Sequence, residues 1–234
     1  TLPFPRNGDL HGEQPAIVAR SADDLRKALR AARERALTLD VSALTRMLRL
    51  DGRRRHIELQ ASAPRSALHG HGVAPALEGS IGDAVSANAP GPGGTPMVSH
   101  VEAITLVTPD GEVRRADRHA NADLFSLAIG GQGLFGVLYS VTLRIDSLSQ
   151  AIARAEAPVV MDVAAGDGAT ARTAEFLAAP ERLDSILAGF KRVAAERRIA
   201  LQQIRVRRIS PENDTFLRWA TREWAEITLR YAMR

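Results

Sequence analysis

The chain has 234 residues, of which 45% are hydrophobic and 25% charged, a composition typical of a soluble globular protein with one large or two small domains. It contains no cysteine, which excludes disulfides, thiolate metal sites, iron–sulfur clusters and cysteine nucleophiles. The formal net charge is +4, but the arginines are spread among acidic residues and aromatic residues make up only 4%, so we expect no nucleic-acid binding.

Metal binding and membrane insertion are also not expected. None of the six histidines falls in a metal-binding pattern such as HExxH, and His69 and His71 would diverge on a helix. No apolar run approaches the roughly 20 residues that span a bilayer. The opening residues TLPFPRNGDL lack the features of a signal peptide, so the expected location is cytoplasmic. The oligomeric state stays open.

The first 60 residues predict a β-α-β unit followed by a hairpin. Residues 15–20 (PAIVAR) are typical of a short strand. Ser21, with Asp24 three residues later, predicts the start of an amphipathic helix that runs to about Leu37. The run LTLDVSA is a second strand, and residues 47–61 alternate around an Asp-Gly pair as a β-hairpin does.

A second hairpin is predicted over residues 100–117, again around an Asp-Gly pair. Between the hairpins, residues 78–94 (EGSIGDAVSANAPGPGG) show no strong periodicity and form either a flexible loop or a ligand cradle. After them, residues 121–129 predict a helix, and residues 137–145 a strand. Four glycines lie between the two, at 130, 131, 133 and 136. Such a turn is a ligand loop or a plain connector.

The second half predicts an α+β unit with its own core. Residues 151–173 show no clear pattern, and residues 180–197 predict a helix. The apolar side chains expected on its buried face are Leu183, Ile186, Leu187, Phe190 and Val193. A strand over residues 199–209, a turn, a short helix around residues 216–220 and a final strand near residues 224–233 complete the prediction.

The segment from Val98 to Ile145 resembles the FAD-binding domain of the vanillyl-alcohol oxidase family, also called the PCMH-type flavoprotein fold. The resemblance rests on a strand, a DG turn, a second strand, NADLF and then GGQGLFGV. It implies an α+β fold, with a two-subdomain PCMH-type FAD-binding domain over residues 1–150. A partial substrate (cap) domain, similar to those of alditol-oxidase-like and cytokinin-dehydrogenase-like members, would follow over residues 151–234.

The chain departs from the family pattern at two loops. Asp40 passes directly into Val41, where the family has its pyrophosphate-binding RGG loop, and Asp83 joins Ala84 without the central TVGG residues. A diphosphate without these amide donors loses several charge-assisted hydrogen bonds of about 1.5–3 kcal/mol each. Either the protein is a degenerate member, or loop segments are missing from the sequence. We favour missing segments, because the strands on both sides are intact.

The resemblance also implies which residues contact FAD. One group lies in the loop of residues 78–94 and would bind the ribityl diphosphate part of the cofactor: Gly82, Ser86, Asn88 and Gly91. A second group would place the adenosine end: Gly131, Gly133, Gly136 and Val137. For Ser86 and Asn88 the alternative is ordinary loop capping.

On the strand of residues 199–209, Gln203, Arg205 and Arg207 share one face. Arg205 matches an active-site arginine of alditol-oxidase-like enzymes, and Gln203 replaces the acid two residues before it. Both are the catalytic candidates that the resemblance implies. The alternative is that these arginines face solvent on an edge strand. Arg230 is a weaker candidate, and no general base can be named.

These features predict an FAD-dependent oxidoreductase. It would transfer a hydride from the CH–OH group of a small alcohol or polyol-like substrate to flavin N5, and then reduce oxygen or another acceptor. A non-catalytic flavin-fold binding protein without the diphosphate loop is the alternative. An arginine-rich nucleic-acid binder is a third hypothesis, which predicts steep salt dependence.

Overall fold

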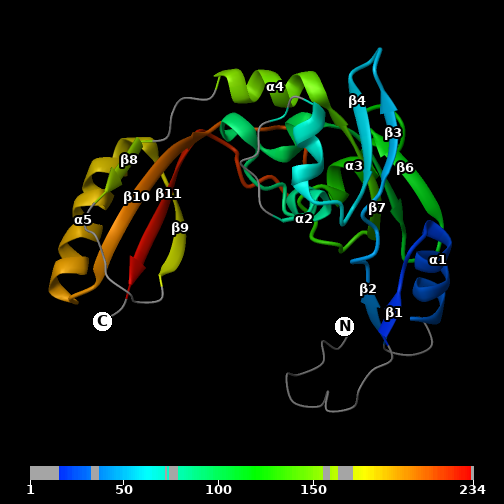
Figure 1. Ribbon diagram of the computed structural model, residues 1–234, viewed down its shortest axis with the longest axis horizontal. Helices are drawn as coiled ribbons and strands as arrows, with labels where there is room; N and C mark the ends of the chain where they lie inside the picture. Colours follow the sequence, from blue (N-terminus) through cyan, green and yellow to red (C-terminus); the bar gives the residue numbers. More distant parts are fainter. Residues whose placement is uncertain are drawn as a thin grey trace.

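The computed structural model describes residues 16–32, 37–71, 73, 79–154, 159–162 and 171–232. The strands of these ranges form three sheets, of two, five and four strands. The first two sheets lie in one half of the molecule, and the four-stranded sheet with helix α5 lies in the other (Figure 1). The mixture of helices and mainly antiparallel sheets agrees with the prediction. The proposed boundary at residue 150 falls inside a helix, and the division into domains stays a prediction.

The small N-terminal unit consists of β1 (Ala16–Val18), α1 (Ala22–Ala31) and β2 (Thr38–Asp40), with β1 and β2 parallel. Helix α1 begins as predicted, because the side chain of Ser21 accepts a hydrogen bond from the Asp24 amide at 3.2 Å. It ends at Ala31 and not near Leu37, and residues 33–36 lie outside the described residues.

A five-stranded antiparallel sheet is the centre of the first half. Its strands, in the order β3-β4-β7-β5-β6, are β3 (Met47–Asp51), β4 (His56–Gln60), β7 (Val137–Arg144), β5 (Val101–Val107) and β6 (Val113–Asp117). Both Asp-Gly hairpins are confirmed, since β3 pairs with β4 and β5 with β6. The strand predicted after the glycine turn, β7, is the middle strand of the sheet.

Three helices supply apolar side chains to the core of this half: α2 (Ile81–Ser86), α3 (Ala122–Ala128) and α4 (Ile145–Arg154). Only α3 is predicted from the sequence. Helix α2 forms in the segment that we expected to lack regular structure, and Ser80 caps it by accepting from the Asp83 amide at 3.0 Å. Helix α4 continues directly from β7 and buries Ile145 and Leu148.

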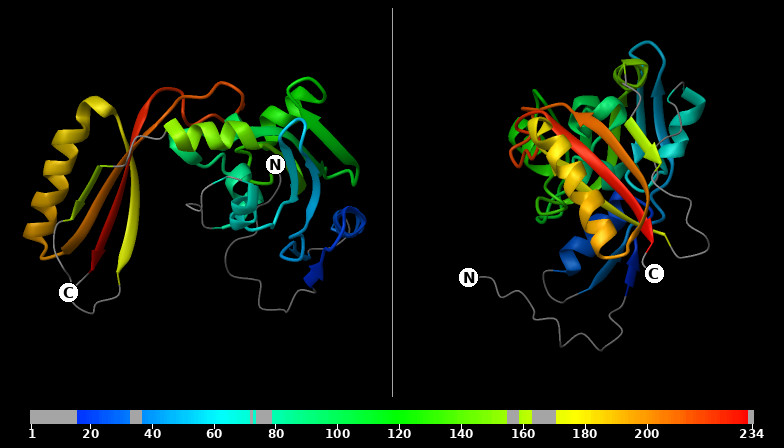
Figure 2. Two further views of the ribbon diagram at one scale, coloured as in Figure 1. Left: turned by 45° about the horizontal axis from the view of Figure 1, so that its top comes forward. Right: turned by 90° about the vertical axis from the view of Figure 1, so that its left-hand side faces the viewer.

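The second half is a four-stranded antiparallel sheet with one helix on one face. Its order is β8-β10-β11-β9, from β8 (Val159–Asp162), β10 (Ala200–Ile209), β11 (Trp224–Ala232) and β9 (Arg172–Ala178). Helix α5 (Leu183–Glu196) covers the face that is turned away from the first half (Figure 2).

Two predictions in this half are wrong. On α5 the expected residues pack against the sheet up to Phe190, but Val193 is 45% exposed and Ala194, one turn after Phe190, takes the inner position. Residues 216–220 form turns and no helix. The Phe216 amide instead donates to the carbonyl oxygen of Ser126 in α3 at 2.9 Å.

Two consecutive glycines join the halves. Gly93 and Gly94, in the short 3₁₀ turn Pro92–Gly94, have φ angles of +64° and +74°. A Cβ atom at Gly94 would overlap the carbonyl oxygen of Arg208, and one at Gly93 would overlap that of Ala151 in α4. The Ser210 amide donates to the Gly94 carbonyl at 2.8 Å. The loop after α2 therefore contacts β10 and α4 through backbone atoms.

We predict that Gly94→Ala lowers the free energy of unfolding by about 2 kcal/mol or more, because the methyl group meets backbone and the φ angle disfavours L residues. Urea denaturation measures the change. The control is Gly189→Ala inside α5, where a Cβ has open space; it should stabilise by about 0.5–1 kcal/mol. Equal stability of wild type and Gly94→Ala would contradict the close contact.

Candidate functional site

The glycine turn and the end of α2 lie against each other. The Gly130 amide donates to the Val85 carbonyl at 3.1 Å, and the Gln132 amide to the Ser86 carbonyl at 3.0 Å. Ser86 itself is half-buried. The structure therefore brings together the two segments that the family resemblance assigns to the cofactor, although Ser86 and Gly130 are 44 positions apart in the sequence.

Most of the predicted cofactor glycines pack closely against the protein itself. A Cβ would lie 2.7 Å from the Ala61 oxygen at Gly82, 2.9 Å from the Thr95 oxygen at Gly91, and 2.6 Å from the Val107 oxygen at Gly136. Close backbone packing explains these glycines without a ligand.

The remaining residues of the glycine turn differ in exposure. Gly131 is buried, and its Cβ would lie 2.9 Å from the Phe135 ring. Gly133, with φ +82°, is exposed and has nothing within 4 Å of its Cβ position. Val137 is half-buried and pairs with Val107 in the sheet. Gly133 is thus the predicted glycine with the most room beside it.

Asn88 has an internal role. It is fully buried, its Oδ1 accepts from the Val98 amide at 2.9 Å, and its Nδ2 donates to Oε1 of Glu212 at 3.3 Å. Its carbonyl oxygen accepts from the indole nitrogen of Trp219 at 3.0 Å. The structure accounts for Asn88 as a bridge between the loop after α2 and the β10–β11 connection, as in the loop-capping alternative.

Glu212, the buried partner of Asn88, is not identified from the sequence. It is 5% exposed and accepts from the amides of Asp214 at 2.8 Å and Thr215 at 3.0 Å. The sequence SPENDT predicts only a turn here. Nothing local indicates that its carboxylate also reaches a residue 124 positions earlier.

The structure also fills the place where the family has its pyrophosphate loop. Asp40 accepts from the Ser42 amide at 2.8 Å, and the Leu44 amide donates to the Val41 carbonyl at 3.0 Å. The hydrogen bonds from Ser42 lower the pKa of Asp40 below its usual range. A short turn with a carboxylate on its first amide is unsuited to a diphosphate, because the carboxylate repels it.

The two catalytic candidates lie on β10, in the other half of the molecule from the glycine turn (Figure 1). The edge-strand interpretation is wrong, since β10 pairs with β8 on one side and β11 on the other. Arg205 is exposed, and its cross-strand neighbours are Thr228 and Val160. Gln203 is half-buried opposite Arg230. Their face of the sheet is the one without α5.

A stronger interaction on the same face was missed in the sequence. Both Nη2 and Nε of Arg207 donate to the carboxylate of Glu226, which is 7% exposed, and the Nη2 to Oε1 distance is 3.0 Å. The alternation of side chains along β11 could have indicated the position of Glu226. Arg207 also lies near Arg65 of the first half. The pKa of Arg65 is lowered, mainly by burial and also by the positive charge of Arg207, while the carboxylate of Asp83 raises it.

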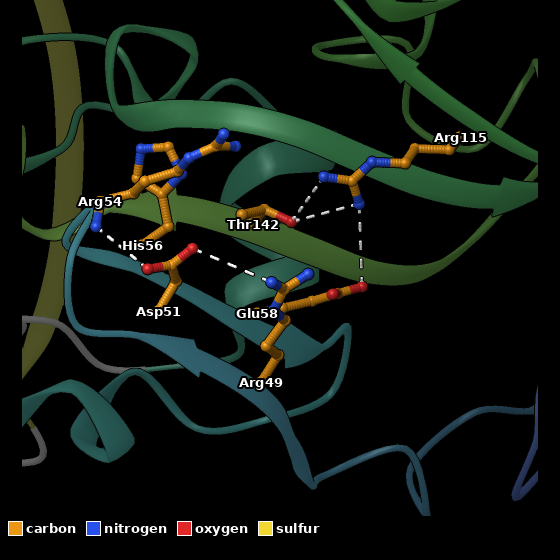
Figure 3. Close-up of a pocket in the computed structure, with 7 residues that line it drawn as sticks. All are labelled: Arg49, Asp51, Arg54, His56, Glu58, Arg115 and Thr142. Carbon is orange, nitrogen blue, oxygen red and sulfur yellow. Dashed lines mark hydrogen bonds and ion pairs between the residues drawn. The ribbon is translucent and has the colours of Figure 1, made fainter.

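Two pockets adjoin the five-stranded sheet. The smaller, here called the sheet pocket, has a volume of about 80 Å³ and lies on the polar face of the sheet (Figure 3). The larger, here called the arginine pocket, has a volume of about 670 Å³ and lies between α4, the Pro92–Gly94 turn and the β3–β4 turn. None of the predicted cofactor residues lines either pocket.

His100 forms part of the wall of the arginine pocket. It is 1% exposed, with Nε2 2.7 Å from Oγ1 of Thr95 and Nδ1 2.9 Å from Oγ of Ser147. Burial, and then the positive charge of Arg144, lower the pKa of His100 to about 4. It is therefore neutral at physiological pH.

Among the residues that the structure describes, the donors for FAD are incomplete. The glycine turn offers one open backbone position at Gly133, but Asn88 uses both side-chain groups internally and Asp40 stands at the expected diphosphate loop. These residues alone do not fit the diphosphate of FAD. No group of three or more His, Asp or Glu in the described ranges could hold a metal. None of the described helices is long and apolar enough to cross a membrane.

No family model and no curated protein sequence matches the chain. Among solved structures it is similar to BBE-like 1 of Physcomitrella patens, with a TM-score of 0.51 and 14% identity over 92% of this chain and 48% of that one. For berberine bridge enzyme from Eschscholzia californica the TM-score is 0.49 and the identity 14%, over 94% of this chain and 46% of that one. For a variant of berberine bridge enzyme in complex with (S)-reticuline the TM-score is 0.47 and the identity 14%, over 93% of this chain and 45% of that one.

The chain thus spans less than half the length of these structures. Of the three, only BBE-like 1 exceeds a TM-score of 0.5, and at 14% identity this value shows a shared fold.

Replacing Asn88 tests its internal role. We predict that Asn88→Ala lowers the free energy of unfolding by about 2 kcal/mol, because it leaves the buried amide of Val98 unpaired and removes one donor from the buried carboxylate of Glu212. Asn213→Ala is the control, since Asn213 is exposed and accepts from Arg218 at 3.0 Å, and it should change stability by less than about 0.5 kcal/mol. Urea denaturation compares them. Similar values for the two variants would contradict the internal role.

His100 should make stability depend on pH. Its folded pKa of about 4 is below the unfolded value of 6.5, so the unfolded chain takes up the proton first as the pH falls. The stabilisation is complete above pH 6.5 and is lost between 6.5 and 4, by an amount on the order of 3 kcal/mol. Unfolding curves across this range should show the loss in wild type and not in His100→Gln. The exposed-histidine control His69→Gln should behave as wild type.

Proposed function

We propose that the protein is an FAD-dependent oxidoreductase that acts on the CH–OH group of a small alcohol or polyol-like substrate and passes the electrons to oxygen or another acceptor. The observation that carries the proposal is the contact between the glycine turn and α2, through Gly130 with Val85 and Gln132 with Ser86. It joins the two segments that the family resemblance assigns to the cofactor. The fold shared with BBE-like 1 is consistent with it.

In this proposal the flavin carries out the redox step, and the chain supplies position and charge. Gly133 and its neighbours in the turn would hold the adenosine end. Arg205 and Gln203, on the sheet face turned toward the first half, would lie on the substrate side, where the guanidinium would hold a substrate oxygen. The diphosphate requires further amide donors, which segments inserted after Asp40 and Asp83 would provide.

A second candidate is a flavin-fold binding protein without catalysis. It is favoured by two residues at the expected cofactor loops that form hydrogen bonds within the protein, Asp40 with Ser42 and Asn88 with Glu212. In this case the fold is stable and FAD has no site.

The two candidates differ in FAD affinity. The protein made from its gene should show flavin absorption after addition of FAD and bind it with a Kd at or below about 1 μM. The 234-residue chain should bind more than about 100-fold more weakly, because it lacks two or more charge-assisted hydrogen bonds. Titration monitored by flavin fluorescence measures both.

Mass spectrometry of the purified gene product shows whether it is longer than the 234-residue chain. A mass above 25.2 kDa, together with tight FAD binding, supports the oxidoreductase. A mass of 25.2 kDa with no binding at about 100 μM FAD refutes it and leaves the second candidate.

A further inference from the structure

The arginine pocket has the size and position of a small-molecule site. Its volume of about 670 Å³ lies within the range of roughly 300–1,000 Å³ common for ligand pockets. Four segments distant in sequence build its wall: the β3–β4 turn, residues 93–100, the continuous run from the end of β7 through α4, and Ser210 after β10. A pocket held by four packed segments keeps its shape better than a hollow in a single loop.

The lining carries an excess of positive charge. Four arginines line the pocket, Arg54, Arg55, Arg144 and Arg154, with one carboxylate, Asp146. Nε of Arg55 lies 3.0 Å from Oδ1 of Asp146, so this pair is compensated. The other three guanidinium groups face the same space without a carboxylate among the lining residues, which favours an anionic occupant.

The neighbouring sheet pocket gives a direct comparison, since Arg54 and His56 line both. There Arg115 lies 4.0 Å from Glu58, and Arg49 lies 3.9 Å from Asp51 (Figure 3). Asp51 also accepts from Arg54, but from its main-chain nitrogen at 3.0 Å and not from its guanidinium. The sheet pocket therefore pairs two of its three arginines with carboxylates, whereas the arginine pocket pairs one of four.

Arg144 adds an independent observation. Its Nη2 donates to the carbonyl oxygen of Ser99, but its Nε is buried and has no hydrogen-bond partner in the structure. A buried guanidinium nitrogen without an acceptor is costly.

We propose that the arginine pocket binds the diphosphate group of a small organic molecule, of the class of nucleoside diphosphates. Guanidinium groups pair with phosphate oxygens through two parallel hydrogen bonds. Three of them, from the β3–β4 turn, the end of β7 and the end of α4, match two adjacent phosphates better than a single carboxylate. The volume leaves room for an organic part beside the phosphates. The site is separate from the glycine turn and does not depend on the flavin proposal.

Isothermal titration calorimetry of the whole chain with ADP, pyrophosphate and orthophosphate tests the site. We expect saturable binding of ADP at about 0.15 M salt with a Kd below about 100 μM, and weaker binding of orthophosphate, which offers fewer oxygens. Pyrophosphate as tight as ADP would show that the diphosphate alone is recognised. ADP tighter than pyrophosphate would show that the organic part contributes as well.

The double variant Arg54→Gln/Arg154→Gln lacks two exposed guanidinium groups and should bind ADP at least about tenfold more weakly. The matched control is Arg49→Gln in the sheet pocket, which should change the Kd by less than about twofold. No saturable ADP binding up to about 5 mM would overturn the proposal, as would equal losses in the double variant and in Arg49→Gln. Far-UV circular dichroism confirms that each variant is folded.

Discussion

The carboxylate of Glu212 is buried, and the contact between the two halves depends on the hydrogen bonds that this carboxylate accepts. It accepts hydrogen bonds from Asp214, Thr215 and Asn88, so the β10–β11 connection and the loop after α2 are fixed to one acceptor. A buried carboxylate tolerates no loss of donors, because desolvation is compensated only by its hydrogen bonds. The same loop carries Gly93 and Gly94, whose backbone meets β10 and α4.

This constraint changes the interpretation of the candidate site. The residues that resemble flavin contacts are also those that hold the protein together, since Asn88 bridges to Glu212 and Gly82 packs on Ala61. The feature not explained by packing is the excess of arginine on the opposite side of the same loop, beyond Gly93.

The sequence was sufficient for several features whose signal was local. Both Asp-Gly hairpins, the Ser21 cap and the strand after the glycine turn depend on neighbours within a few residues, and all are observed. Helix α2 was missed because its six residues are too few to show a period. The inner position of β10 and the bond between Asn88 and Glu212 were missed because their partners lie far away along the chain.

The joint between the halves also has a consequence for how the chain folds. The bonds of Asn88 to Glu212 and to Trp219 span 124 and 131 residues, whereas each hairpin closes over a short loop. Contacts of such sequence separation form only after a large loss of chain entropy, so they raise the contact order and slow folding. During synthesis the first half can bury its core before residue 212 leaves the ribosome, yet Asn88 then still lacks its partners. The joint can therefore form only after residues 212 and 219 have been synthesised.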